Sequence, residues 1–198
     1  RYTKNKIFLF IITILAGCNI PAPVPLPTPT PIEKTEIPAY LFYSISNITE
    51  LKQWLQNNYN YIKDEDWSGY KDYPLTPAEF FMSEILIYGV PVQRTPITGD
   101  CEDYASLTAY LLWKVLDYDA YIAIIPEFSE PNISHMISFG KGPNGKFVVV
   151  NSPWISTQYS SIDEYMQTAY PDKRLGNITP IETYLEKLYS QGHHRYCN

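Results

Sequence analysis

The spacing of apolar residues changes from a helical period to a period of two after about residue 116, and this change limits the possible folds more than any other feature. Helical spacing predicts three early helices, over about 47–59, 76–88 and 101–116. Alternating apolar residues predict three later strands, over 119–126, 133–140 and 146–151. Two short helices are expected near 161–169 and 179–190. Helices followed by strands indicate an α+β domain.

Residues 1–17 have the pattern of a secretory signal peptide. Basic residues at positions 1, 4 and 6 precede an apolar run, Ile7–Ala16, that is too short to span a bilayer. The run ends in the sequence LAGC, which resembles the lipobox of bacterial lipoproteins, and Cys18 is then the cysteine that receives a diacylglycerol. The resemblance predicts a lipoprotein anchored to a membrane of the bacterial cell envelope and facing outside the cytoplasm. The alternative is a buried cysteine at the end of an ordinary apolar helix.

Residues 18–38 form the expected linker between this anchor and a folded domain over 39–198. Prolines alternate with small residues over 21–31, and proline lacks the N–H that a helix or a central strand needs. The segment is therefore expected to be an extended polyproline II spacer.

The charge balance excludes one class of partner. The chain has 15 Lys and Arg against 21 Asp and Glu, and three of the basic residues belong to the signal segment 1–17. A domain this acidic repels phosphate backbones, so we expect no nucleic-acid partner.

The segment GDCEDYA, residues 99–105, places Cys101 at the start of the predicted third helix. The dipole and unpaired N–H groups at a helix start stabilise a thiolate, and the same N–H groups can hold an oxyanion. Glu102 and Asp103 add negative charge that opposes the thiolate. The sequence therefore indicates a nucleophile that needs a base.

His135 is the candidate base, because the other histidines, 193–194, lie in a polar C-terminal segment. His135 shares a strand face with Ile137, and we expect that face to pack on the helix that begins with Cys101. Asn151, at the end of the next strand, can orient the imidazole through its amide. A histidine among core-facing residues is otherwise most often structural.

The catalytic interpretation makes a prediction about the turn between the two strands. Opposed residues in an antiparallel pair share a face, and their numbers have a constant sum. His135 and Asn151 share a face only if that sum is even, which requires an odd-length loop. A three-residue loop, 143–145, with left-handed Gly145, would make His135 the diagonal neighbour of Asn151.

At these residues the chain resembles the transglutaminase-like superfamily, which has a papain-like core. GDCEDYA, a strand histidine and a polar residue closing the next strand match the family's Cys–His–Asp pattern in order and spacing, over about residues 45–155. The third position departs from the family, because Asn151 stands where Asp is usual. An amide can orient a histidine but cannot stabilise imidazolium by charge.

The resemblance implies a papain/transglutaminase-like fold and a thiol enzyme that acts on amides. Cys101 would attack an amide of a peptide, protein or cell-wall substrate, with His135 relaying the proton and Asn151 orienting it. The acyl group would pass to water or to an amine. Gln93 is a candidate oxyanion donor, and no cofactor or metal is expected.

Other interpretations remain open at this point. Cys101 and Cys197 could form a disulfide in an oxidising compartment. Residues 193, 194 and 197 could bind a metal, although a fourth ligand is lacking. The domain could also be a non-catalytic peptide- or glycan-binding module on the same fold. Aromatic residues at positions 67, 70 and 73 would suit such a binding surface.

Overall fold

The computed structural model describes residues 37–69, 73–87, 90–126, 128 and 134–191. The chain falls into two units, 1–30 and 31–198, and all described residues belong to the second. The signal segment, Cys18, most of the linker and the C-terminal residues 192–198 lie outside the described part. None of the described helices combines the length and apolar character needed to cross a membrane.

The domain is α+β, as the change of period predicts. Its helices are α1 (Tyr40–Ser44), α2 (Ile48–Asn58), α3 (Asp64–Ser68), the 3-10 turn η1 (Glu79–Phe81), α4 (Cys101–Lys114), α5 (Ile162–Ala169) and α6 (Ile181–Gln191). Its strands are β1 (Asn60–Tyr61), β2 (Glu84–Ile87), β3 (Val90–Gln93), β4 (Thr98–Gly99), β5 (Asp119–Ile125), β6 (His135–Lys141), β7 (Phe147–Asn151), β8 (Trp154–Ser156) and β9 (Ile178–Pro180).

Five antiparallel strands form the central sheet in the order β8-β7-β6-β5-β9. The three predicted strands are confirmed as β5, β6 and β7, while the edge strands β8 and β9 were not predicted. The predicted odd-length turn is also confirmed: Gly142 N–H donates to the Lys146 carbonyl at 2.8 Å, and Gly145 has φ 75°. Ser138 pairs with Val150, so Ile137 is opposite Asn151, as the even sum requires.

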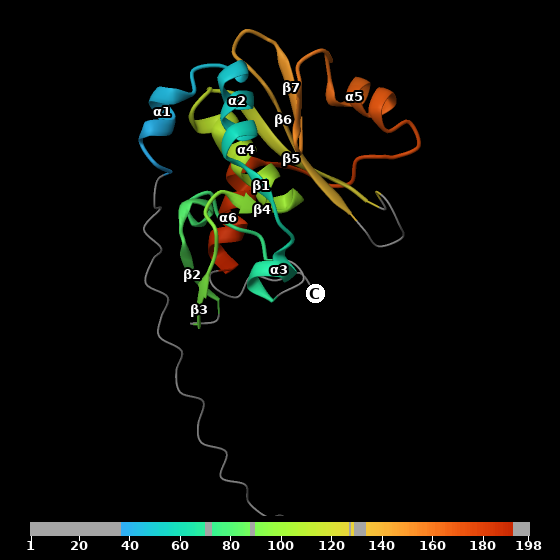
Figure 1. The fold of residues 1–198 in the computed structure, drawn as a ribbon. Helices are drawn as coiled ribbons and strands as arrows, with labels where there is room; N and C mark the ends of the chain where they lie inside the picture. Colours follow the sequence, from blue (N-terminus) through green and yellow to red (C-terminus); the bar gives the residue numbers. More distant parts are fainter. Residues whose placement is uncertain (1–36, 70–72, 88–89, 127, 129–133, 192–198) are drawn as a thin grey trace, which may run out of the picture. The chain divides into compact units, whose positions relative to one another are not determined.

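Helices cover both faces of this sheet (Figure 1). α4 packs on the face of Ser138, whose Oγ lies 2.6 Å from Oγ1 of Thr108. α6 lies beside α4 on the same side of the sheet and shares its apolar core. The opposite face carries Ile137 and Phe139 and packs against Tyr165 of α5.

The expectation that His135 lies on the face packed against α4 is therefore wrong. His135 alternates with Ile137 and Phe139, so it belongs to the α5 face. Both faces of β6 are buried over residues 137–140, and the alternating pattern alone does not distinguish which helix covers which face. The helix that covers the face of His135 is α5, which follows β6 in the chain.

The predicted helix over 76–88 is also wrong, although its capping box forms. Thr76 Oγ1 accepts from the Glu79 N–H at 3.2 Å, and Glu79 Oε2 accepts from the Thr76 N–H at 2.9 Å. Only the 3-10 turn η1 follows. Arg94 Nη1 donates to the Glu79 carbonyl at 2.6 Å, and the Ile97 N–H donates to the Phe80 carbonyl at 2.8 Å. These bonds use the carbonyls that a continuing helix needs, and the chain turns into the β2–β3 hairpin.

The other predicted helices are confirmed with small changes at their ends. Asn47 caps α2 by accepting from the Glu50 N–H at 3.0 Å, and Ser161 caps α5 by accepting from the Glu164 N–H at 3.1 Å. The short elements β1, α3, β3 and β4 occupy segments that the sequence predicts to be loops. β1 pairs in parallel with β4, which leads directly into α4.

Candidate active site

Cys101 is the first residue of α4, and Asp100, the N-cap residue, is all that separates it from the end of β4. Three contacts fix this junction. Tyr59 Oη donates to the carbonyls of Gly99 and Asp100, at 2.7 and 3.0 Å, and the buried Asp103 accepts from the Leu75 N–H at 2.7 Å. A Cβ at Gly99 would overlap the Asp103 carboxylate, so only glycine fits at this close approach. The helix start that carries the thiol is therefore held from both sides.

The surroundings of the thiol are acidic. Cys101 Sγ donates to Oε2 of Glu102 at 3.3 Å, and the Asp100 carboxylate lies in the same cluster. Partial burial and the negative charge of nearby carboxylates, Asp100 and Glu102 among them, raise the pKa of Tyr61 to about 12. The helix dipole favours a thiolate at this position, whereas these carboxylates oppose it. Activation of Cys101 therefore depends on a nearby cation or a base.

A second acidic cluster shares Asp100 with the first. One oxygen from each of Asp64, Asp100 and Asp103 lies within 4.8 Å of the others. Asp103 is fully buried, and burial, Asp64 and Asp100 raise its pKa well above the ordinary value, while the Leu75 N–H and Arg94 lower it. Carboxylate oxygens are the ligands that hard cations prefer. Among the described residues, these three, and also Asp100 with Cys101 and Glu102, are the groups whose spacing could hold a metal ion.

His135 and Asn151 are hydrogen-bonded, as the predicted register allows. His135 Nε2 lies 2.6 Å from Oδ1 of Asn151, across the diagonal of β6 and β7. Asn151 is 9% exposed, and its Nδ2 donates to the hydroxyls of Tyr165 at 2.8 Å and Tyr170 at 2.6 Å. The Phe128 ring packs against the imidazole, with ring centroids 4.5 Å apart and planes tilted by 35°. The ring is thus held by an amide that is itself held by two phenols.

This network selects one tautomer of the imidazole. Because Asn151 uses Nδ2 to donate to the two tyrosines, its Oδ1 is the atom that accepts from His135. With this assignment of the amide, Nε2 carries the proton and Nδ1 is the basic nitrogen. The pair therefore has the protonation pattern of a general base oriented by an amide.

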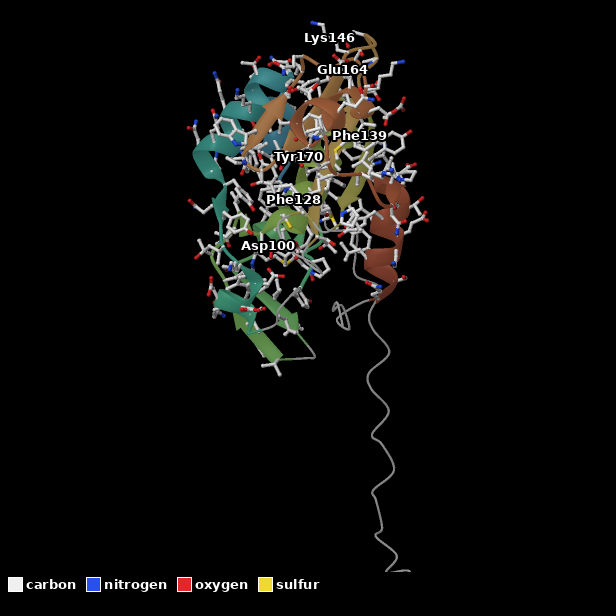
Figure 2. All side chains as sticks on the ribbon, turned by 90° about the vertical axis from the view of Figure 1, so that its right-hand side faces the viewer. Asp100, Phe128, Phe139, Lys146, Glu164 and Tyr170 are labelled. Carbon is white, nitrogen blue, oxygen red and sulfur yellow. The ribbon has the colours of Figure 1, made fainter. Side chains whose placement is uncertain are left out.

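Cys101 and His135 lie at the N-terminal ends of α4 and β6, and these two ends are on the same side of the domain. α4 ends beside the start of β5, where Asp119 pairs with Lys141, so α4 and β6 run in the same direction. From the contact between Thr108 and Ser138, both residues lie about 10 Å back along their own element. In the projection of Figure 2, Asp100, Phe128 and Tyr170 follow one another upward along the domain.

The side chains of Cys101 and His135 belong to opposite sides of the central sheet. Cys101 begins a helix that covers one face of the sheet, and His135 projects from the other face. β7 ends at Asn151, which is opposite Ile137, so β7 does not run alongside His135. At His135, β6 therefore pairs with β5 on one side but has no β7 residue beside it on the other.

Gln93, the candidate oxyanion donor, lies on the exposed strand β3. Its Nε2 donates to the Glu84 carboxylate of the paired strand β2. Among the aromatic residues considered for a binding surface, Tyr73 is fully buried and Trp67 packs against Tyr73 and the Arg94 guanidinium. Position 70 lies outside the described residues, as do the candidate metal ligands at 193, 194 and 197.

Three aromatic residues that surround the pair were not found from the sequence: Phe128, Tyr165 and Tyr170. Helical spacing of Ile162, Tyr165 and Met166 indicates the buried face of α5 but gives no sign that a hydroxyl there reaches Asn151. Tyr170 caps the C-terminus of that helix, a position that periodicity does not mark.

Comparison with known proteins adds no family to this description. No protein-family model matches the chain, and no curated protein sequence matches it.

Proposed function

We propose that the protein is an extracytoplasmic, lipid-anchored thiol enzyme of transglutaminase-like type that attacks amide or peptide carbonyls through Cys101, His135 and Asn151. The hydrogen bond between His135 and Asn151 carries this proposal, because it was expected from the catalytic interpretation and depends on an odd-length turn. The proposal is also supported by the position of Cys101 at the start of α4, on the same side of the domain as His135 at the start of β6. The papain-like core is part of the same proposal.

The proposed reaction uses each of the three side chains once. His135 Nδ1 takes the proton of the Cys101 thiol, and the thiolate attacks the carbonyl carbon of the substrate amide. The imidazolium returns the proton to the amine nitrogen as the C–N bond breaks, which leaves a thioester on Cys101. Water or a second amine then attacks the thioester, and His135 accepts its proton. Asn151 keeps the imidazole in the tautomer that makes Nδ1 the base.

Because carboxylates lie beside the Cys101 thiol, this mechanism requires a positive charge next to the thiolate. Asp100 and Glu102 oppose a lone thiolate, so a reactive Cys101 needs the positive charge of an imidazolium next to it. The His135 ring must then reach past the end of the sheet to the start of α4. Cys18, the proposed site of the lipid anchor, lies outside the described residues.

The test is the rate at which iodoacetamide alkylates Cys101 in the full chain, followed on the peptide that contains it. An ordinary thiol is only a few per cent ionised at pH 7, whereas a thiolate–imidazolium pair reacts at lower pH. We expect fast labelling at pH 6, and a rate at least about tenfold lower in His135→Ala. Lys141→Ala, at the other end of β6, is the matched control and should label like the original chain.

Equal labelling rates in the original chain and His135→Ala would contradict the enzyme proposal. They would favour a non-catalytic peptide- or glycan-binding module on the same fold. Circular dichroism of each variant shows that a lower rate does not come from unfolding.

A further inference from the structure

A small cavity lies between the helix that carries Cys101 and the turn that follows Asn151. It has a volume of about 190 Å³ and is lined by Leu55, Gln56, Tyr59, Tyr104, Pro153 and Trp154. These residues come from α2 and its C-cap, from α4 and from the β7–β8 hairpin. The cavity is therefore built from segments distant in the sequence.

Each wall of the cavity adjoins one of the proposed catalytic residues. Tyr59 donates to the Asp100 carbonyl, next to Cys101, and Tyr104 lies one helical turn after Cys101 on the same side of α4. On the other wall, Trp154 is the cross-strand partner of Asn151. A substrate carbonyl held at Cys101 would thus place a neighbouring side chain at this cavity.

The lining selects an uncharged and aromatic occupant. None of the six lining residues carries a charge, and three of them are aromatic, with Tyr59 and Tyr104 packed edge to face at 4.5 Å. A cavity of about 150 Å³ is enough for benzene, so this one has room for a phenyl ring. Asp100 and Glu102 at the thiol disfavour an acidic side chain nearby. Trp154 is 67% exposed, so one side of the lining is open to an incoming chain.

We infer that this cavity is a specificity subsite that binds an aromatic side chain of the amide substrate, next to the bond that is cleaved. The inference rests on the proposed function, because it makes Cys101 the site of attack. The exposed indole of Trp154 would contact the bound ring, as aromatic pairs in protein interiors do, while Tyr104, only 2% exposed, closes the inner end of the cavity. Substrates with small or charged side chains at this position would lose that contact.

The test compares how well two small amides protect Cys101 from iodoacetamide in the full chain. N-acetylphenylalaninamide should give half protection at a concentration about tenfold lower than N-acetylalaninamide. Trp154→Ala should bring the two compounds within about twofold of each other. Tyr43→Ala, which removes an aromatic ring 87% exposed on α1, is the matched control and should keep the tenfold difference.

Two further measurements guard against a misfolded variant. Gln56→Trp enlarges an exposed residue of the lining and should reduce protection by the phenylalanine compound. The indole N–H signal of Trp154, assigned with Trp154→Phe, should shift when N-acetylphenylalaninamide is added to Cys101→Ser. Equal protection by the two amides, a tenfold difference that survives Trp154→Ala, or an unmoved indole signal would each overturn the subsite.

These outcomes are separate from a failure of the proposed function. The protection ratio is measured within one protein and does not depend on how reactive the thiol is. The enzyme proposal fails instead if His135→Ala leaves the rate of Cys101 alkylation unchanged when no amide is added. A chain with an aromatic subsite and no effect of His135 would be a binding module that recognises aromatic side chains.

Discussion

Replacing Asn151 by alanine tests the part of the site with the most complete set of contacts. Asn151 is 9% exposed and makes three side-chain hydrogen bonds: to His135 Nε2, Tyr165 Oη and Tyr170 Oη. A typical hydrogen bond contributes about 1 kcal/mol net, and a buried partner left unsatisfied costs about 1–3 kcal/mol. Tyr170 and His135 are partly exposed and can turn to water, so we expect the free energy of unfolding to fall by about 2–4 kcal/mol.

The assay is urea unfolding followed by circular dichroism, together with the rate of Cys101 alkylation. The slope of unfolding free energy with urea should stay unchanged, since the surface exposed on unfolding is the same. Alkylation at pH 6 should slow, because the imidazole loses the group that orients it. Asn144→Ala removes one exposed hydrogen bond, to the Lys146 N–H, and should cost about 0.5 kcal/mol or less.

A third variant separates orientation from stability. Asn151→Asp keeps an oxygen for His135 Nε2 and can accept from both tyrosine hydroxyls, so it should fold. Its carboxylate stabilises imidazolium, and the high-pH limb of the alkylation profile should move to higher pH. The reasoning is refuted if Asn151→Ala lowers the free energy of unfolding by less than about 0.5 kcal/mol and Cys101 is alkylated as fast as in the original chain. The three hydrogen bonds would then neither stabilise the fold nor orient the imidazole.

Three other predictions concern the helix start and the anchor. Burial and neighbouring carboxylates raise the pKa of Asp103, so the folded state keeps its proton where the unfolded chain has lost it, and stability falls as pH rises from about 4 through that raised pKa. Asp103→Asn cannot ionise and should flatten this decline in urea unfolding with EDTA present; an unchanged slope between pH 4 and 8 contradicts it. Gly99→Ala should cost about 1–3 kcal/mol, measured by thermal unfolding, because its Cβ would overlap the Asp103 carboxylate, and a neutral result means the junction yields. Cys18→Ser should release the protein from the membrane fraction of a bacterial host, and persistent membrane attachment argues against the lipid anchor.

The three central strands β5, β6 and β7 could be predicted from alternating apolar residues, and the His135–Asn151 pair follows from their register once the turn between β6 and β7 has an odd length. Asn144 and Gly145 indicate a tight turn but not its length, and a two- or four-residue loop would put His135 and Asn151 on opposite faces. The odd length was expected only because the catalytic interpretation requires it. The hydrogen bond at 2.6 Å agrees with that reasoning. The start of α4 at Cys101 could also be predicted, because a glycine-marked turn precedes a run of helical spacing.

The remaining features depend on contacts between distant segments. The helix expected over 76–88 has a correct capping box, but Arg94 and Ile97 bond to the carbonyls it needs. Which helix covers the face of His135 is decided by the packing of α4 and α5, and strand alternation has no information on it. Of the tyrosines that hold Asn151, Tyr165 lies in α5, whose side-chain pattern indicates only burial, and Tyr170 is the C-cap that follows it.

The three-residue loop at 143–145 restricts how the gene for this protein can change. Inserting or deleting one codon there would turn β7 over, so that Asn151 pointed toward α4 and Val150 toward α5. The Asn151 amide would then no longer contact the imidazole of His135. The valines of β7 would still be buried, because one apolar side chain would take the place of another on each face. The protein could then keep its core while losing its proposed chemistry. Loop lengths in functional descendants should therefore differ by two residues, or by one residue with a compensating bulge in the adjoining strands.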